Sequence, residues 1–112
     1  MRLPRQILMH WRTALKLDLN FSDFQEDLFR LEKKELHALI RTLRRCAKMD
    51  FQQFMQSSGL NAEKIKNMRT EQGHAVYSLR VSRSFRATFT VQGDFLRFIG
   101  LHPDHDSAYG GK

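Results

Sequence analysis

The chain has 112 residues and a mass of 13.2 kDa, enough for one domain with a modest core. Its 19 Lys and Arg residues outnumber 12 Asp and Glu residues, and the resulting net charge of +7 favours a polyanionic partner over solubility alone. The single cysteine excludes an internal disulfide and indicates a reducing compartment, the cytoplasm. No apolar run is long enough to span a bilayer, so we expect no membrane partner.

Residues 1–14 are interpreted as an N-terminal extension, followed by one domain over residues 15–112. Leu3, Ile7 and Trp11 recur at four-residue steps, which predicts a short amphipathic helix. That helix could pack on the domain, dock a partner or stay loose. Residues 15–21 then alternate between apolar and polar side chains, which predicts a half-buried strand.

The middle of the chain has helical spacing. Ser22 and Gln25 are placed for a capping box, and apolar residues continue at helical intervals to Ala47 with a break near residues 33–35. This pattern predicts an antiparallel helical hairpin, with Cys46 as a small buried side chain. Its outer face carries a basic stripe that is either simply solvated or binds a partner: Arg41, Arg44, Arg45 and Lys48.

A third helix is predicted to begin at Asp50, where Gln53 completes a second capping box, and to be ended by Ser57, Ser58 and Gly59. Residues 60–74 are polar and basic, and we interpret them as a connector.

Three runs between residues 76 and 102 have the period-two alternation of strands. The Gly93-Asp94 turn sets Thr90 opposite Arg97, Thr88 opposite Ile99 and Arg86 opposite Leu101, and a three-residue loop over 83–85 sets Arg80 opposite Thr88. One face is then apolar: Tyr77, Leu79, Val81, Ala87, Phe89, Val91, Leu96 and Phe98. The other face carries Arg80, Arg86 and Arg97. The predicted fold class is α+β, with the N-terminal strand and helical hairpin packed on one face of a small antiparallel sheet.

After the last strand the chain gathers titratable side chains in a short polar tail: His102, Asp104, His105, Asp106 and Tyr109. Pro103 ends the strand, so the tail is expected to fold back beside Arg86. A metal site in this tail is a weaker alternative, because four ligands within five residues do not easily converge on one ion. A plain polar turn is another, and we predict neither a metal nor a cofactor.

The segments LKLDLNFSDFQEDLFRL, YSLRVSRSFRATF and HPDHDSAY give residues 15–110 a layout that resembles the RelE/ParE toxin superfamily. Arg80 and Arg86 match basic residues on the open sheet face of these toxins, and Tyr109 matches their near-terminal tyrosine. The resemblance implies a RelE-like fold and a ribosome-dependent endoribonuclease of a toxin–antitoxin pair. It implies as partners a cognate antitoxin, the ribosome and mRNA, in a homo-oligomer or a toxin–antitoxin hetero-oligomer.

The chain departs from RelE itself at Pro103, where an arginine is expected, and at Ser78, where a lysine is expected. With fewer cations, the histidines would have a larger share of the chemistry. Two other functions stay open: a ParE-type inhibitor of DNA gyrase, for which the tail is dispensable, and a non-catalytic nucleic-acid or protein-binding module using the basic helical stripe.

Metal-free RNA cleavage needs a base for the 2′-hydroxyl, an acid for the departing 5′-oxygen, and cations for the charge on phosphorus. His105 or His102 is the predicted base, and Tyr109 or the other histidine the predicted acid. Arg86 and Arg80 are predicted to clamp the phosphate. Further contacts to RNA are assigned to five basic residues: Arg83, Arg97, Arg44, Arg45 and Lys48. Each of these residues has the simpler alternative of a solvated surface position.

Overall fold

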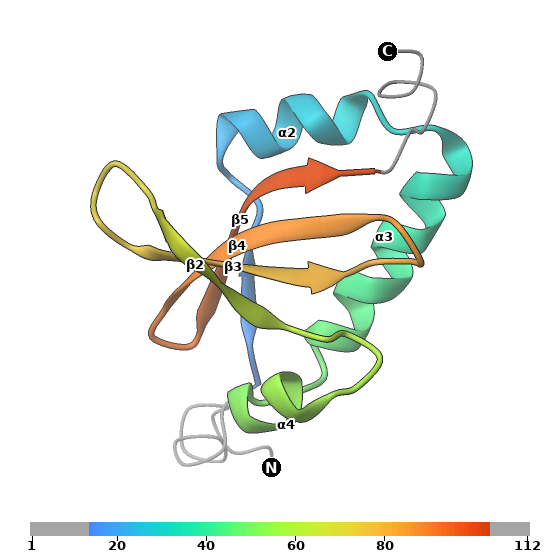
Figure 1. The fold of residues 1–112 in the computed structure, drawn as a ribbon. Helices are drawn as coiled ribbons and strands as arrows, with labels where there is room; N and C mark the ends of the chain where they lie inside the picture. The colour runs from blue at the N-terminus through green and yellow to red at the C-terminus, as the bar shows by residue number, and fades with distance from the viewer. Residues whose placement is uncertain (1–13, 104–112) are drawn as a thin grey trace, which may run out of the picture.

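A five-stranded sheet, with strand order β1-β5-β4-β3-β2, is the framework of the protein (Figure 1). It is seen in a computed structural model that describes residues 14–103. The predicted N-terminal helix lies outside the described residues, as does the chain beyond Pro103. In chain order the elements are β1 (Lys16–Asp18), α2 (Ser22–Phe29), α3 (Lys33–Cys46), α4 (Phe51–Gln56), β2 (Glu63–Arg69), β3 (Ala75–Arg80), β4 (Arg86–Gln92) and β5 (Phe95–His102). None of these helices is long and apolar enough to cross a membrane.

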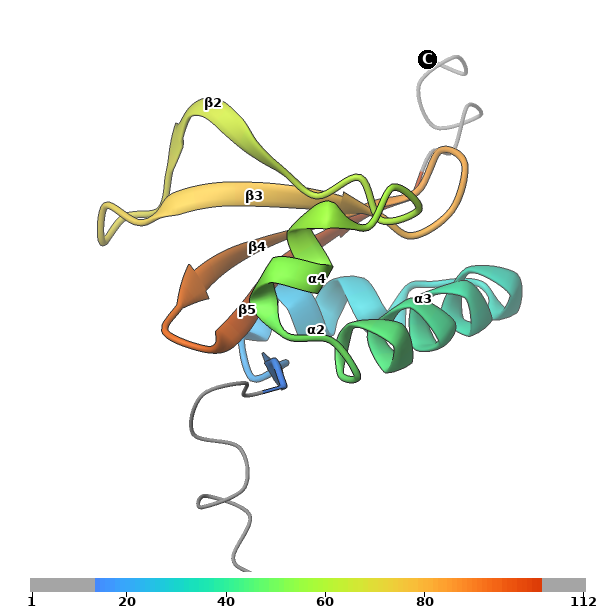
Figure 2. The ribbon, with the colours of Figure 1, turned by 90° about the horizontal axis from the view of Figure 1, so that it is seen from below.

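The α+β class is confirmed, with α3 and α4 covering one face of the sheet (Figure 2). The sheet is mixed, because β1 runs parallel to β5 while the other pairs are antiparallel. The segment 60–74, predicted to be a connector, instead supplies the edge strand β2. Six of the seven β2 residues are exposed, so this strand lacks the buried alternation by which a sequence reveals a strand.

The core forms where the inner face of the sheet meets the helices. Phe24 of α2 packs on Phe98 with ring centroids 5.9 Å apart, and Phe54 of α4 meets Phe89 edge-on at 5.5 Å. Every side chain predicted for the apolar face belongs to this core or packs against it. The outer side of the sheet, away from α3 and α4, is called the open face below.

The helix starts follow the predictions only in part. α4 has the predicted capping box between Asp50 and Gln53. Ser22 does not cap α2: the N-cap residue is Phe21, and the Gln25 side chain donates to the Leu19 carbonyl oxygen instead. α2 and α3 also diverge from their bend and do not lie side by side as an antiparallel hairpin (Figure 1).

The register of β4 and β5 is as predicted near the Gly93 turn, including the pair Thr90 and Arg97. It then shifts by one residue between Phe89 and Thr88, because β5 contains an extra residue at a bulge. As a result, Arg86 lies opposite His102 and not opposite Leu101 as predicted.

The β3–β4 connection is also longer than predicted. It spans residues 81–85, and it sets Arg80 opposite Arg86 and Ser78 opposite Thr88. This is a shift of two residues from the predicted pairing of Arg80 with Thr88. Because side chains alternate with period two, the shift leaves every side chain of these strands on its predicted face.

Candidate active site

Arg86 begins β4 and presents its guanidinium on the open face. Its Nε and Nη2 donate to the buried Ser78 hydroxyl at 3.2 and 2.7 Å, and Nη2 also donates to the Asn61 carbonyl oxygen at 3.3 Å. Glu63 lies beside it, with Oε2 3.7 Å from Nη2. These contacts fix the plane of the guanidinium. Nη1 makes none of these bonds, so it is the nitrogen best placed to receive an anionic oxygen.

His102 ends β5 directly opposite Arg86. Its Nε2 lies 3.0 Å from the Thr88 hydroxyl oxygen, and that hydroxyl donates to the Gly100 carbonyl oxygen at 3.4 Å. The Thr88 hydroxyl thus contacts both the imidazole and the backbone of β5. His102 is exposed, so packing around the ring does little to orient it. The contact with Thr88 on the adjacent strand β4 sets its orientation instead.

Gly100 makes room for this imidazole. A Cβ atom added at Gly100 would lie 3.0 Å from the Thr88 hydroxyl oxygen and 3.1 Å from His102 Nε2, closer than nearly all real Cβ contacts. Any larger residue would therefore displace the hydroxyl or the ring. The bulge in β5 and Gly100 together position His102 beside Arg86.

Two hollows adjoin these side chains, and His102 and Thr88 line both. The larger, of about 710 Å³, lies between α2 and the β2–β3 turn. Its α2 wall is acidic, with Asp23, Glu26 and Asp27. The smaller, of about 480 Å³, lies under β2 and includes Arg86.

Arg97 faces the larger hollow, near its Phe21 end. Its Nε is 3.7 Å from Asp18 Oδ2, and its guanidinium carbon is 5.5 Å from the centroid of the Phe21 ring. This side chain is on the predicted face, but it is paired with Thr90, well along the strand from Arg86. Arg97 therefore does not join the Arg86–His102 pair.

The other predicted arginines of the sheet lie at the end of the β3–β4 hairpin. Arg80 is exposed and opposite Arg86 in register, while Arg83 is exposed in the 81–85 turn. Neither lines the two hollows. Their roles as phosphate clamp and RNA contact stay predictions.

The helical basic residues belong to α3 and the turn after it, and α3 lies on the helix-covered side of the sheet (Figure 2). Arg44 and Arg45 lie in the last turn of α3, and Lys48 follows the helix. Arg45 Nη2 reaches the Ser57 hydroxyl at 3.5 Å. Any RNA contact by these residues would need a surface separate from Arg86 and His102.

His105 and Tyr109 lie outside the described residues, so their roles as base or acid stay predictions. Sequence reasoning missed the partners that orient Arg86, because Glu63 and Asn61 belong to a segment interpreted as a connector. The alternation of charged residues around Ile65 in EKIKNMR was the available signal for a strand there. Among residues 14–103, no group of three or more His, Cys, Asp or Glu side chains could hold a metal ion.

Two solved structures share the fold of this chain. No family model and no curated protein sequence matches the chain. A chain of the archaeal RelE–RelB complex from Pyrococcus horikoshii OT3 matches with a TM-score of 0.57 and 11% identity, over 81% of this chain and 96% of that one. The YoeB dimer from Staphylococcus aureus matches with a TM-score of 0.54 and 18% identity, over 83% and 100%. The chain therefore has the fold of the RelE-like toxins, as its sequence resemblance predicted.

Proposed function

We propose that this protein is the toxin of a toxin–antitoxin pair and cleaves mRNA on the ribosome. The observation that carries the proposal is the pair formed by Arg86 and His102, directly opposite each other on the open face of a RelE-like fold. The solved RelE–RelB complex supports a cognate antitoxin as the partner that holds the toxin inactive.

The reaction fits the chemistry of these two side chains. The 2′-oxygen attacks phosphorus while its proton passes to a base, and the 5′-oxygen leaves with a proton from an acid. The products are a 2′,3′-cyclic phosphate and a 5′-hydroxyl end. A ring nitrogen of His102 serves as the base, and His105 or Tyr109 supplies the acid. Arg86 stabilises the charge that develops on the phosphoryl oxygens.

Glu63 has to release Arg86 when the phosphate binds. The Glu63 side chain is 63% exposed and its oxygen is 3.7 Å from Arg86 Nη2, and an exposed pair of this kind contributes at most about 1 kcal/mol. A phosphate offers Nη1 of the guanidinium a charge-assisted contact instead. The exchange therefore favours the bound phosphate, while Ser78 continues to hold the side chain.

The test is induction of the chain in cells, with mapping of mRNA 5′ ends. We expect growth arrest and new 5′-hydroxyl ends within coding sequences. Arg86→Ala and His102→Ala are expected to lower cleavage by about 10²-fold or more. His105→Ala and Tyr109→Phe identify the acid. Arg30→Ala and His37→Ala, at exposed positions on the helical side, are the matched controls and should cleave as the wild type does.

Two results would contradict the proposal. Growth arrest with intact mRNA and broken DNA would indicate a gyrase inhibitor. Soluble protein with neither arrest nor cleavage would indicate a non-catalytic binding module.

A further inference from the structure

β2 arches away from the sheet in its middle. It pairs with β3 at Glu63 and Lys64 and again at Arg69, so the four residues 65–68 face the single residue Val76. Asn67 has a φ of 62°, in the left-handed region that few residues other than Gly, Asn and Asp adopt readily. Figure 2 shows the strand rising from β3 and returning to it.

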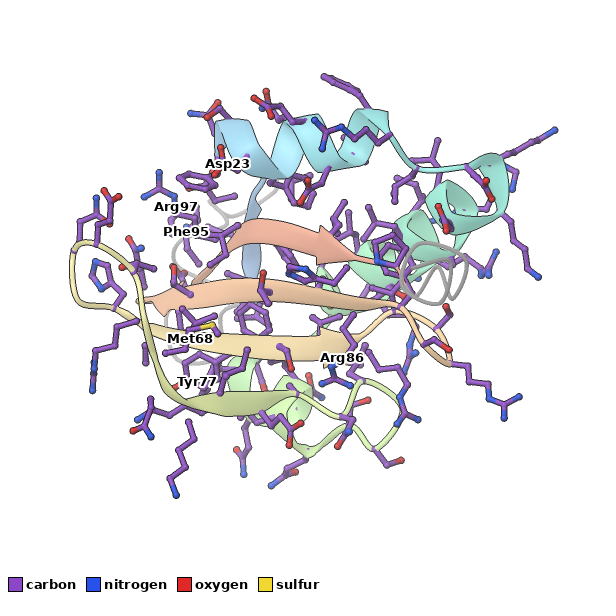
Figure 3. All side chains as sticks on the ribbon, turned by 45° about the horizontal axis from the view of Figure 1, so that its top comes forward. Asp23, Met68, Tyr77, Arg86, Phe95 and Arg97 are labelled. Carbon is purple, nitrogen blue, oxygen red and sulfur yellow. The ribbon has the colours of Figure 1, made fainter. Side chains whose placement is uncertain are left out.

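The arch turns two apolar side chains to the same side. In a regular strand, residues three apart point to opposite faces, yet Ile65 and Met68 both line the smaller hollow. Figure 3 shows Met68 reaching from β2 over the sheet. Val76 and Ile99 complete an apolar wall, and Arg86 and His102 also line the cavity.

We propose that this cavity binds one nucleobase of the RNA whose phosphate is held by Arg86 and whose 2′-hydroxyl meets His102. The inference rests on the proposed function and names the subsite that recognises its substrate. Its volume of about 480 Å³ is in the range of small-ligand pockets. An apolar wall with a guanidinium and an imidazole beside it suits a flat ring attached to a phosphate.

The hydroxyl groups of the cavity and the flexible Met68 side chain both favour a nucleobase as the occupant. The Ser78 hydroxyl is used by Arg86, and the Thr88 hydroxyl is used by His102. Apart from Ser84, the remaining uncharged surface for contact is aliphatic and thioether. Met68 is 47% exposed, and its flexible thioether makes favourable contacts with aromatic rings.

The acidic wall of the larger hollow makes the smaller cavity the better place for an RNA strand. Lys64 and Lys66 are exposed on β2 but do not line the cavity, and Lys64 lies opposite Tyr77 of the inner face. The larger hollow is also lined by Arg69 and Arg97, but Asp23, Glu26 and Asp27 along its α2 wall repel phosphates there. The smaller cavity combines an apolar wall with the Arg86 guanidinium and the His102 imidazole.

The test compares a 2′-O-methyl trinucleotide, which cannot be cleaved through its 2′-oxygen, with the same molecule lacking its central base. Binding to the full chain is followed by NMR of the Met68 and Ile65 methyl groups. We expect the intact trinucleotide to shift both methyl signals and to bind at least about fivefold more tightly than the abasic one. Met68→Ala should remove that difference, and Met68→Leu should keep it. Ile40→Ala, a similarly exposed aliphatic side chain on the helical side, should leave it unchanged.

Equal binding of the two trinucleotides, no binding of either, or methyl signals that do not move would overturn the nucleobase site. This outcome is separate from the fate of the proposed nuclease. Base-dependent binding without any mRNA cleavage in cells would leave the subsite standing and contradict the nuclease. Cleavage without base-dependent binding would support the nuclease and contradict the nucleobase site.

Discussion

At the scale of single residues, the structure explains why a serine at position 78 can replace the expected lysine. The resemblance led us to expect a lysine at this position. Ser78 is instead the buried acceptor of two bonds from Arg86, at 2.7 and 3.2 Å. The expected lysine is therefore replaced by a serine that orients the Arg86 guanidinium. This contact depends on the register between β3 and β4. The register predicted from the sequence was wrong by two residues.

Gly100 is predicted to control activity more than stability. Gly100→Ala places a Cβ against the Thr88 hydroxyl and the His102 ring, so the imidazole has to move. Because small misplacements of a reacting group are costly, we expect a roughly tenfold to hundredfold fall in the cleavage rate. Gly59→Ala is the control, since its new Cβ meets only the flexible Arg45 guanidinium. Equal cleavage rates for the Gly100 and Gly59 variants would contradict this role, provided that urea unfolding shows both to be folded.

Cys46 is predicted to make stability depend on alkaline pH. Burial raises the pKa of its thiol from 9.0 to about 11. The unfolded thiol therefore ionises first, so stability is complete below pH 9 and is lost as the pH rises towards 11. The loss should approach ~2 kcal/mol. Urea unfolding of the wild type and of Cys46→Ala between pH 8 and 11 measures it. Parallel pH profiles for the two proteins would contradict the prediction.

At the scale of elements, α2 stabilises the strand that ends in His102. The Leu101 amide, beyond the end of the short β1, donates to the Asp27 carboxylate at 3.0 Å. Asp27→Ala leaves that amide without its acceptor and should cost about 2 kcal/mol of unfolding free energy. Hydrogen exchange at Leu101 should quicken in parallel. Asp23→Ala, on the same helix, is the control, and an equal loss in both variants would show that helix charge alone is responsible.

The N-termini of α2 and α4 look alike in sequence, with Ser22 and Asp50 as candidate N-cap residues, but they differ in the structure. Asp50→Ala removes an acceptor from the Gln53 amide and should cost about 1 kcal/mol. Ser22→Ala should be within a few tenths of a kcal/mol of the wild type, because Ser22 makes no cap bond. Thermal or urea unfolding of both variants checks this, and equal costs would contradict the assigned α2 start.

The sequence predicted those features of the elements that depend on local chemistry. Gly93 does adopt a positive φ in its turn, and alternation assigned the inner face correctly. The bulge in β5 was not predictable, because it depends on the packing of Leu101 and Phe98 into one core. β2 was missed because an exposed edge strand carries little periodicity. These two irregularities build the candidate site and the cavity beside it.

At the scale of the whole molecule, helices cover one face of the sheet and leave the other available to a partner. The net charge of +7 predicted a polyanion, but its distribution separates two basic surfaces. Arg86 lies on the open face, whereas Arg41, Arg44 and Arg45 lie on α3. The fold class was predictable from alternation and helix spacing. The choice between the surfaces was not, because it depends on which residues meet across the sheet.

The central claim is that Arg86 and His102 act together on one phosphodiester. It is tested most directly by the cleavage rate of ribosome-bound mRNA with the purified wild type, Arg86→Ala, His102→Ala and the double variant. We predict that each single variant slows cleavage by about 10²-fold or more, and that the double variant is little slower than either, because residues acting as a unit are not additive. Wild-type products should end in a 2′,3′-cyclic phosphate and a 5′-hydroxyl. Cleavage by Arg86→Ala or His102→Ala at the wild-type rate would contradict the claim.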